Sequence, residues 1–317
     1  MSDKETKHTA EDLKTMQSWS LERKIQVTQT RIIEWYEYWK GKVYISFSGG
    51  KDSTVLLDLA RRIYPDIEAV FIDTGLEYPE LREFVKTINN VRWLKPEMNF
   101  KQVINTYGYP LISKEVADNV YRARNGSQNA IDRMNGLNPD GTLSNFKKGN
   151  IKYKYLLNAP FEISNKCCNV MKKKPAKKYE KETGNKPIIA TMACESTFRK
   201  TGWLQVGCNA FKKDRPSSQP MSFWTEQDVL EYIKRFNIPY ASVYGDIIKE
   251  NDTYKTSGCE RTGCVFCGFG CHLDKTPNRF QKLKQTHPKL WEYCMKPVYE
   301  GGLGMKDVLE YIGVKID

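Results

Sequence analysis

Apolar and polar positions along the first third of the chain follow two different periods. Between residues 21 and 40 apolar residues recur every three or four positions, and Gly41 follows as a stop signal. The segment VYISFS, residues 43–48, is β-branched and aromatic, and residues 52–62 place apolar side chains on one face of a helix. The pattern therefore predicts a helix, a strand, a glycine turn and a second helix in this order.

The same alternation continues along the chain. It predicts further strands in residues 67–75, 91–96 and 186–193, and further helices in residues 79–90, 100–107 and 225–236. Thr225 resembles an N-cap, because acidic residues follow it in the first turn of the last of these helices. Strands that alternate with helices imply a parallel sheet covered on both faces, so the predicted fold class is α/β with a doubly wound parallel sheet.

Two stretches depart from this pattern. Residues 122–150 are rich in Asn, Gly and Ser and carry no sustained period, which predicts an exposed insertion at about 122–155. From about residue 252 the chain is cysteine-bearing and less regular, until two helix-like segments near the C-terminus. We therefore expect an N-terminal helical segment, 1–40, an α/β domain, 41–250, and a cysteine-rich C-terminal region, 251–317.

Composition narrows the class of partner and the compartment. The chain has 50 Lys and Arg against 38 Asp and Glu, a formal charge of +12, which favours an anionic partner: a nucleotide, a sulfate or a nucleic acid. Residues 1–20 are polar and lack the apolar core of a signal peptide, so we expect a cytoplasmic protein. Because that compartment keeps thiols reduced, closely spaced members of the nine cysteines indicate metal or redox chemistry.

The hexapeptide SGGKDS, residues 48–53, lies between the first predicted strand and the next helix. Gly49 and Gly50 allow backbone conformations that a side chain forbids, so successive N–H groups can converge on one anion at the helix start. Lys51 adds a positive charge, and the neighbouring serines add hydroxyl donors. The spacing is not that of a Walker A loop. The segment predicts a phosphate-binding loop rather than a plain tight turn.

SGGKDS resembles the signature of the PP-loop nucleotide-binding superfamily, and FIDTGLEYPE, residues 71–80, resembles a segment of its phosphoadenosine phosphosulfate (PAPS) reductase family. CCNVMKKKP, residues 167–175, is similar to the double-cysteine segment of the iron–sulfur branch, although Met171 stands where an arginine is expected. Three further segments resemble the family's Ser-x-x-Arg, Trp-Thr-x-x-Asp-Val and Cys-x-x-Cys elements: ESTFRK (195–200), WTEQDV (224–229) and TGCVFC (262–267). The resemblance runs from about residue 43 to 270.

This resemblance implies a Rossmann-like PP-loop domain that binds ATP or an adenylyl sulfate, with the cysteine-rich part folded back over the nucleotide. The nucleotide-binding residues it implies are Ser48, Gly49, Gly50, Lys51, Asp52, Ser53, Asp73, Thr74 and Gly75. It implies catalytic roles for Lys51, Asp52, Lys172 and Arg199. A carboxylate repels phosphate, so we expect Asp52 to act through Mg²⁺ or to cap the following helix.

The cysteines allow two ligand sets for a metal. The resemblance implies Cys167, Cys168, Cys264 and Cys267, whereas local spacing alone permits Cys259 and Cys271 together with Cys264 and Cys267. A mixture of the two sets, such as Cys168 with three of the later cysteines, also stays open. Four thiolates suit zinc or a [4Fe-4S] cluster. The adjacent cysteine pair is unusual in zinc sites and matches the cluster-bearing relatives, so we expect iron–sulfur, with zinc as the alternative.

Three functions compete on this basis. One is ATP-dependent sulfur transfer to nucleic acid, either tRNA or DNA, in which ATP is cleaved to AMP and pyrophosphate. The second is a PAPS or adenylyl sulfate (APS) reductase that releases sulfite, although the sequence ends MKDVLEYIGVKID without the reductases' Glu-Cys-Gly-x-His segment. The third is a nucleotide-binding module without turnover. Either enzyme implies a sulfur or electron donor protein as a partner.

Lysines and aromatic residues interleave near the end of the insertion. Lys147, Lys148, Lys152 and Lys154 alternate with Phe146, Tyr153 and Tyr155. Such a pattern suits a nucleic-acid strand, whose phosphates bind lysine and whose bases stack on aromatic rings. A solvated basic loop has the same composition, so both interpretations stay open from the sequence.

Overall fold

The computed structural model describes residues 7–144 and 150–316, and within it the chain divides into two compact units. Unit 1 comprises residues 1–73, 77–95 and 176–262, and unit 2 comprises residues 74–76, 96–175 and 263–317. No helix among the described residues is both long and apolar enough to cross a membrane.

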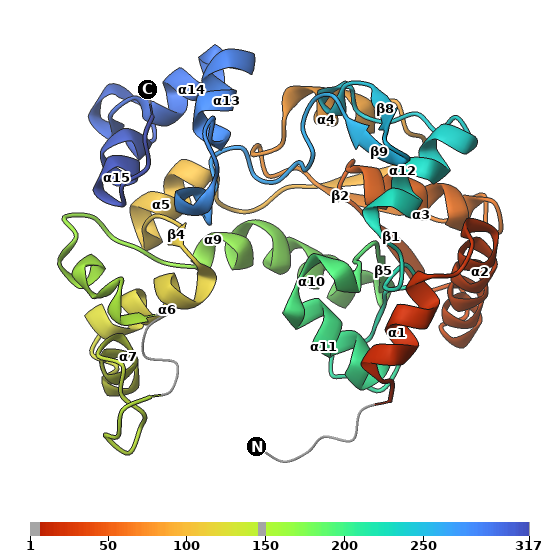
Figure 1. The fold of residues 1–317 in the computed structure, drawn as a ribbon, viewed down its shortest axis with the longest axis horizontal. Helices are drawn as coiled ribbons and strands as arrows, with labels where there is room; N and C mark the ends of the chain where they lie inside the picture. The colour runs from red at the N-terminus through yellow and green to blue at the C-terminus, as the bar shows by residue number, and fades with distance from the viewer. Residues whose placement is uncertain (1–6, 145–149, 317) are drawn as a thin grey trace. The chain divides into compact units, whose positions relative to one another are not determined.

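A six-stranded sheet forms the centre of unit 1 (Figure 1). Its spatial order is β3-β2-β1-β5-β7-β6, and all neighbouring strands are parallel except β6 and β7. The strands are β1 (Val43–Phe47), β2 (Ala69–Ile72), β3 (Val91–Leu94), β5 (Lys186–Ile189), β6 (Asn209–Ala210) and β7 (Ser217–Ser218). A separate antiparallel hairpin consists of β8 (Ile247–Glu250) and β9 (Thr253–Thr256). The mostly parallel α/β sheet confirms the predicted fold class.

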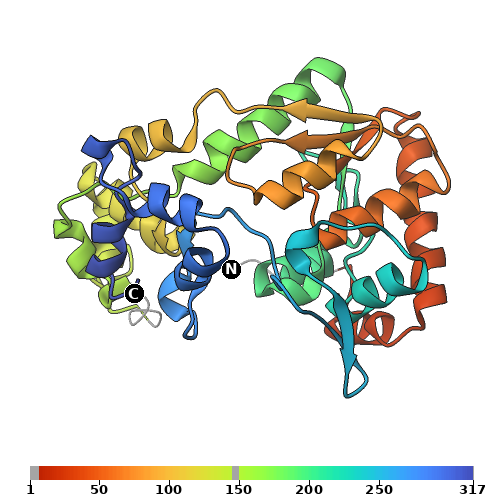
Figure 2. The same cartoon turned by 90° about the horizontal axis from the view of Figure 1, so that it is seen from above.

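Helices cover both faces of this sheet. They are α1 (Ala10–Gln17), α2 (Leu21–Tyr38), α3 (Lys51–Arg61), α4 (Pro79–Lys86), α10 (Lys174–Thr183), α11 (Thr197–Val206) and α12 (Glu226–Arg235). Successive strand residues point to opposite faces. Ile45 and Phe71 therefore share one apolar core with α2, α3, α4 and α12, whereas Tyr44 and Val70 pack with Tyr179 of α10 on the other face. The strands β2 and β3 run side by side in register from Ala69 opposite Val91 (Figure 2).

Unit 2 is mainly helical. Its helices are α5 (Phe100–Tyr107), α6 (Lys114–Arg124), α7 (Gln128–Met134), α9 (Lys166–Cys168), α13 (Arg279–Thr286), α14 (Pro288–Met295) and α15 (Met305–Tyr311). The segment Asn169–Lys173 that follows α9 is a π-helix. A short parallel pair joins β4 (Leu111–Ile112) to β10 (Gly268–Phe269), which connects the segment before α6 to the cysteine-rich loop.

Most predicted elements lie where the sequence placed them. The segment 100–107 is helical throughout, and Thr225 caps α12 in a capping box with Asp228. The helix predicted for residues 79–90 ends at Lys86. The exposed insertion is more ordered than its composition suggested, because it contains α7, whose Ala130 and Met134 are fully buried. The predicted division into functional domains stays a prediction.

Candidate nucleotide site and cysteine cluster

The position of the nucleotide site follows from the order of the strands in unit 1. The order reverses between β1 and β5, because β2 lies on one side of β1 and β5 on the other. In open parallel sheets, ligands bind in the crevice beyond the carboxyl ends of the strands at such a switch point. The SGGKDS loop follows β1, and the segment with Glu195 and Arg199 follows β5. Both segments therefore meet at this edge.

Glycine is required at the turn itself. Gly49 has a φ of +73°, and a Cβ atom built there would lie 2.7 Å from side-chain atoms of both Leu81 and Val85. Gly50 is the N-cap residue of α3 and uses no side chain to cap it. The backbone N–H groups at the start of α3 thus face the loop, as in anion sites at helix N-termini.

The hydroxyl groups of the loop bond within the loop itself. Ser53 Oγ accepts the backbone N–H of Ser48 at 3.2 Å and donates to the Gly50 carbonyl at 2.9 Å. Thr54 Oγ1 donates to the same carbonyl at 3.0 Å, and Ser48 Oγ accepts the Gly50 N–H at 3.3 Å. These hydroxyls therefore hold the loop in shape.

Lys51 is buried, and both its ammonium group and its backbone N–H have hydrogen-bond partners within unit 1. Its ammonium nitrogen lies 2.7 Å from Glu226 Oε1 and 2.8 Å from the Glu260 carbonyl oxygen. Its backbone N–H donates to the hydroxyl of Tyr244 at 3.4 Å, and that hydroxyl also lies 2.6 Å from Thr262 Oγ1. The residues 258–262 and the first turn of α12 thus contact the same lysine that the sequence assigned to phosphate.

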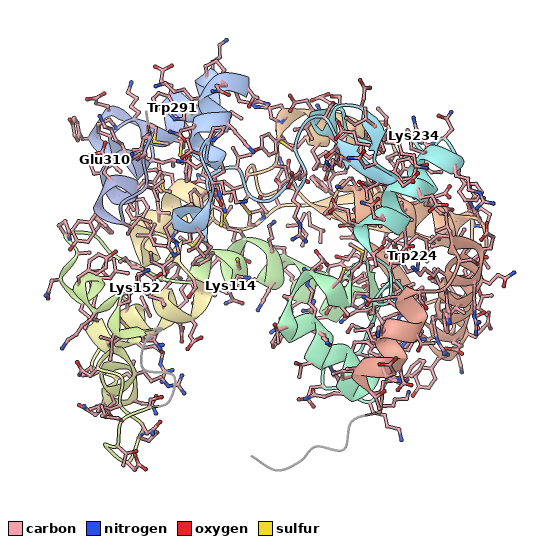
Figure 3. The ribbon with its side chains drawn as sticks, viewed as in Figure 1. Lys114, Lys152, Trp224, Lys234, Trp291 and Glu310 are labelled. Atoms are coloured by element: carbon pink, nitrogen blue, oxygen red, sulfur yellow. The ribbon has the colours of Figure 1, made fainter. Side chains whose placement is uncertain are left out.

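The start of α12 is fixed from several sides, which positions Glu226. Trp224, labelled in Figure 3, is fully buried, and its Nε1 donates to Thr28 Oγ1 at 2.8 Å. Asp228 accepts the Thr225 backbone N–H and also pairs with the buried Lys24, each at 2.7 Å. The Trp-Thr-x-x-Asp pattern therefore has a structural role in this chain: it anchors the helix end that carries Glu226.

Asp52 and two arginines complete the charged environment of the loop. Burial raises the pKa of Asp52, and the positive charges of Lys51 and Arg261 oppose that rise. Arg199 and Arg261 both pair with Glu195, whose side chain is mostly buried. Burial, together with the neighbouring Arg261, lowers the pKa of Arg199. The loop is therefore surrounded by cations, and carboxylates hold them in place.

The DTG segment is divided between the two units. Asp73, which belongs to unit 1, is buried and pairs with Arg82 Nη2 at 2.7 Å. Thr74 and Gly75 belong to unit 2, where Thr74 Oγ1 accepts the Leu76 N–H at 3.2 Å. Their predicted contact with the nucleotide stays a prediction.

Four of the six candidate metal ligands lie near one another in unit 2. The charges of Cys168, Cys264 and Cys267 all act on the Cys167 thiol, and the two adjacent sulfur atoms are 4.0 Å apart. A hydrogen bond from Cys167 and the charges of nearby lysines lower the pKa of Cys168 to about 6. The charge of Cys267 also acts on Cys271, so the choice between the two ligand sets stays a prediction.

The two alternate ligands differ from this group. Cys271 is buried, donates to the Gly268 carbonyl at 3.0 Å, and has its pKa raised by burial to about 12. Cys259 belongs to unit 1, where its backbone N–H bonds to the Val243 carbonyl at 3.0 Å. The ligand set that local spacing permits would therefore combine Cys259 of unit 1 with three cysteines of unit 2.

The four thiols of unit 2 suit a soft metal or an iron–sulfur cluster by their chemistry. Cys267 also accepts the Phe269 backbone N–H, the kind of hydrogen bond that supports a bound thiolate. In the described part of the chain, however, no three His, Cys, Asp or Glu side chains are already arranged as ligands of one ion. The cysteines are gathered, and their side chains would have to turn to close a ligand sphere.

Arg279 shapes the cysteine-rich loop. Its guanidinium pairs with Asp274 at 2.7 Å and donates to the carbonyls of Cys267 and Phe269 at 3.2 and 3.0 Å. Hydrogen bonding to Arg279 lowers the pKa of Asp274. An arginine that spans two carbonyls holds the turn after Cys267 in one conformation.

Lys172 and the described part of the segment rich in lysine and aromatic residues belong to unit 2. Lys172 lies on the π-helix, and its charge acts on Cys168. Tyr153 hydrogen-bonds His272 at 2.9 Å, and Lys152 and Lys154 are exposed. Phe146, Lys147 and Lys148 lie outside the described residues.

Sequence reasoning missed the three residues that contact Lys51, which are Glu226, Tyr244 and Glu260. It also missed the ion pair between Glu195 and Arg261. Glu226 was visible only as an acidic residue in a first helical turn, where it has an ordinary role beside the helix dipole. Glu195 and Arg261 lie within or beside quoted motifs, but at positions that the family pattern leaves open. Only the folded chain brings them together.

Comparison with known proteins places the chain in a family. The family model of the phosphoadenosine phosphosulfate reductase domain matches residues 42–122 and 114–268. An uncharacterized protein of Methanocaldococcus jannaschii is 26% identical over 260 residues, 81% of this chain, and the match covers 41% of that protein, less than half its length. The adenosine 5'-phosphosulfate reductase of Staphylococcus haemolyticus is 23% identical over 240 residues, 72% of this chain and 73% of that enzyme.

A solved structure gives a weaker likeness. The phosphoadenylyl-sulfate reductase of Candida auris aligns with 77% of this chain and 97% of its own, at 15% identity and a TM-score of 0.40, which is too low to support an argument. The family match spans well over half of the chain and includes the SGGKDS loop, the adjacent cysteines and the Cys-x-x-Cys turn. The chain therefore belongs to the phosphoadenosine phosphosulfate reductase domain family.

Proposed function

We propose that unit 1 binds an adenine nucleotide through its phosphates at the SGGKDS loop, and that the protein uses ATP to activate nucleic acid for sulfur transfer. The observation that supports the nucleotide site best is the environment of Lys51. A buried ammonium group at a helix N-terminus is held by an exposed carboxylate, which a phosphate of the same charge sign can replace.

The chemistry proposed for ATP needs an electrophile, a leaving group and charge neutralisation. An oxygen of the nucleic acid attacks the α-phosphorus, the bond between the α- and β-phosphates breaks, and pyrophosphate leaves with the electron pair. Lys51 and the backbone N–H groups of α3 neutralise the departing phosphates. Arg199 stabilises charge that develops on the α-phosphate, and Asp52 would hold Mg²⁺ beside the phosphates.

Sulfur then replaces the activated oxygen. A sulfur nucleophile from a donor protein attacks the carbon or phosphorus atom that bears the adenylated oxygen, the bond from that atom to the oxygen breaks, and AMP leaves with the oxygen. Cys167, Cys168, Cys264 and Cys267 would hold a [4Fe-4S] cluster or zinc in unit 2. Such a centre would supply a Lewis-acidic site that binds sulfur. Lys172 adds a positive charge next to Cys168.

A second candidate is a sulfonucleotide reductase that releases sulfite. The observation that favours it is the match to adenosine 5'-phosphosulfate reductases over 72% of this chain. A reductase of this kind needs a thiol that can attack the substrate sulfur. Cys294 on α14 has 0% exposure, so it is not placed to act as such a thiol.

One product assay separates these functions. Anaerobically purified protein is incubated with ATP, with adenylyl sulfate and with PAPS in parallel, and pyrophosphate, AMP and sulfite are measured. We expect pyrophosphate and AMP from ATP, increased by added nucleic acid, and no sulfite. Sulfite from an adenylyl sulfate would establish the reductase instead. Nucleotide binding without any product would leave a non-catalytic module.

A further inference from the structure

Unit 2 carries most of the net positive charge of the chain. It contains 21 Lys and Arg against 12 Asp and Glu, whereas unit 1 contains 29 against 26. The formal excess is therefore +9 in unit 2 and +3 in unit 1, which together give the +12 of the whole chain. An anionic partner larger than a nucleotide would bind unit 2 more strongly than unit 1.

The two units also differ in how their lysines are paired. Five lysines of unit 1 form ion pairs: Lys24, Lys51, Lys86, Lys249 and Lys255. In unit 2, by contrast, Lys114, Lys166 and Lys173 have no carboxylate within 4.0 Å in the described part of the chain. Their charges are available to a ligand.

These three lysines lie on α6 and on the helical segment that contains Cys168. Lys114 is the first residue of α6, and its carbonyl accepts the side-chain N–H of Asn165 at 3.2 Å, so the start of α6 adjoins the start of α9. The charges of Lys114 and Lys173 both act on the Cys168 thiol. Lys166 precedes that cysteine by two residues. We call Lys114, Lys166 and Lys173 the lysine collar; Lys114 is labelled in Figure 3.

The surroundings of the collar indicate the kind of partner. None of the large hydrophobic residues exposed in the described part of unit 2 belongs to α6, α9 or the π-helix, which carry the collar: Leu143, Ile151, Tyr155, Leu273, Tyr293, Val298, Tyr299 and Tyr311. Stable protein interfaces centre on aromatic or apolar anchors, which these helices do not expose. Its aromatic neighbour is Tyr121, whose half-buried ring has the Lys166 ammonium 5.0 Å from its centre. Lysines without apolar anchors suit a phosphate backbone.

We propose that the lysine collar binds the phosphate backbone of a nucleic acid beside Cys168. This inference rests on the proposed function for the identity of the substrate, and it adds the surface that holds it. Lysine contacts to phosphates carry no base specificity, so the collar positions the strand and does not read its sequence. Lys172 is left out of the collar because it is assigned to the reaction.

The test compares two triple variants. Lys114→Ala/Lys166→Ala/Lys173→Ala removes the collar, and Lys282→Ala/Lys289→Ala/Lys306→Ala removes the same charge from exposed positions of α13, α14 and α15. Fluorescence anisotropy measures binding of a labelled single-stranded RNA and a single-stranded DNA at several salt concentrations. Circular dichroism and thermal unfolding confirm that both variants are folded.

We expect the collar variant to bind more weakly and to show a smaller salt dependence, with the slope of log K against log salt reduced by about 2, or about 0.7 per lost phosphate contact. The control variant should keep a slope close to that of the wild type. Equal losses in both variants, or an unchanged slope in the collar variant, would overturn the proposal. So would equally strong competition by polyglutamate, because it would show a site for acidic protein.

The ATP reaction is measured separately in the same proteins. Nucleic-acid binding that depends on the collar, without pyrophosphate release from ATP, would reject the proposed function and support the collar as a binding surface. Pyrophosphate release together with nucleic-acid binding that is unchanged in the collar variant would support the proposed function and reject the collar as the binding surface.

Discussion

The ammonium group of Lys51 lies 2.7 Å from a carboxylate oxygen of Glu226, although the lysine is buried and the glutamate is half exposed. The two residues are 175 positions apart in the sequence. Glu226 thus places a negative charge beside Lys51, the lysine that we propose binds a phosphate. A phosphate that approaches Lys51 must displace this carboxylate or share the lysine with it.

The first prediction follows from this competition. Glu226→Gln should increase the affinity for ATP by about two- to fivefold, because an ion pair with an exposed partner contributes up to about 1 kcal/mol. Isothermal titration calorimetry measures the change, and Glu231→Gln on the same helix is the control. A loss of affinity in Glu226→Gln would mean that the carboxylate assists binding, for example through Mg²⁺.

The second prediction concerns the backbone of the loop. Gly49→Ala should lower the free energy of unfolding by more than about 2 kcal/mol, because it combines a positive φ with a Cβ only 2.7 Å from Leu81 and Val85. Gly126→Ala has a positive φ but no atom within 4 Å of the added Cβ, so it should cost only about 1 kcal/mol. Urea denaturation compares the two, and equal losses would contradict the steric argument.

The third prediction concerns the pH dependence of stability. Because burial raises the pKa of Asp52 above its ordinary value of 3.8, the folded chain holds this proton more tightly than the unfolded chain. The contribution of this proton to the free energy of unfolding is complete below pH 3.8 and is lost as the pH rises through the raised pKa. In nucleotide-free protein, Asp52→Asn should therefore remove this fall in the free energy of unfolding with rising pH. Parallel pH profiles of wild type and variant would argue against a buried, perturbed Asp52.

Local patterns were sufficient to predict the loop and four strands of the six-stranded sheet, β1, β2, β3 and β5, but not β6 and β7. Residues 43–62 carry their own signals, because a β-branched strand, two glycines and an apolar helix face follow one another directly. The capping box of Thr225 with Asp228 is likewise local, since its partners are three residues apart. Such elements depend on neighbours in the sequence, which is why they were predicted close to their observed bounds.

The partners of Lys51 could not be predicted in this way. Glu226 and the Glu260 carbonyl reach the lysine only after α12 and residues 258–262 pack against α3, and a backbone carbonyl has no sequence signal at all.

The order within the insertion was not predicted for a related reason. The helix α7 is short and polar in composition, and burial of Ala130 and Met134 stabilises it in the folded chain.

The fourth prediction separates the two ligand sets of the metal site. Cys168→Ala should lower the iron and sulfide content of anaerobically prepared protein and its thermal stability, because a centre bound only by the folded chain stabilises it. Cys271→Ala should leave both nearly unchanged, since that thiol bonds to the Gly268 carbonyl. Full iron in the first variant with depleted iron in the second would support the local ligand set, and a colourless protein with one zinc would refute the cluster.

The central claim, that the SGGKDS loop binds nucleotide phosphate through Lys51, is tested most directly by calorimetric titration of ATP into wild-type and Lys51→Ala protein. A hydrogen bond to a charged group contributes about 1.5–3 kcal/mol, so the variant should bind ATP about 10- to 100-fold more weakly while it remains folded. Lys86→Ala removes a lysine from an exposed ion pair of the same unit and should bind as the wild type does. Equal affinities for ATP in wild type and Lys51→Ala would contradict the account.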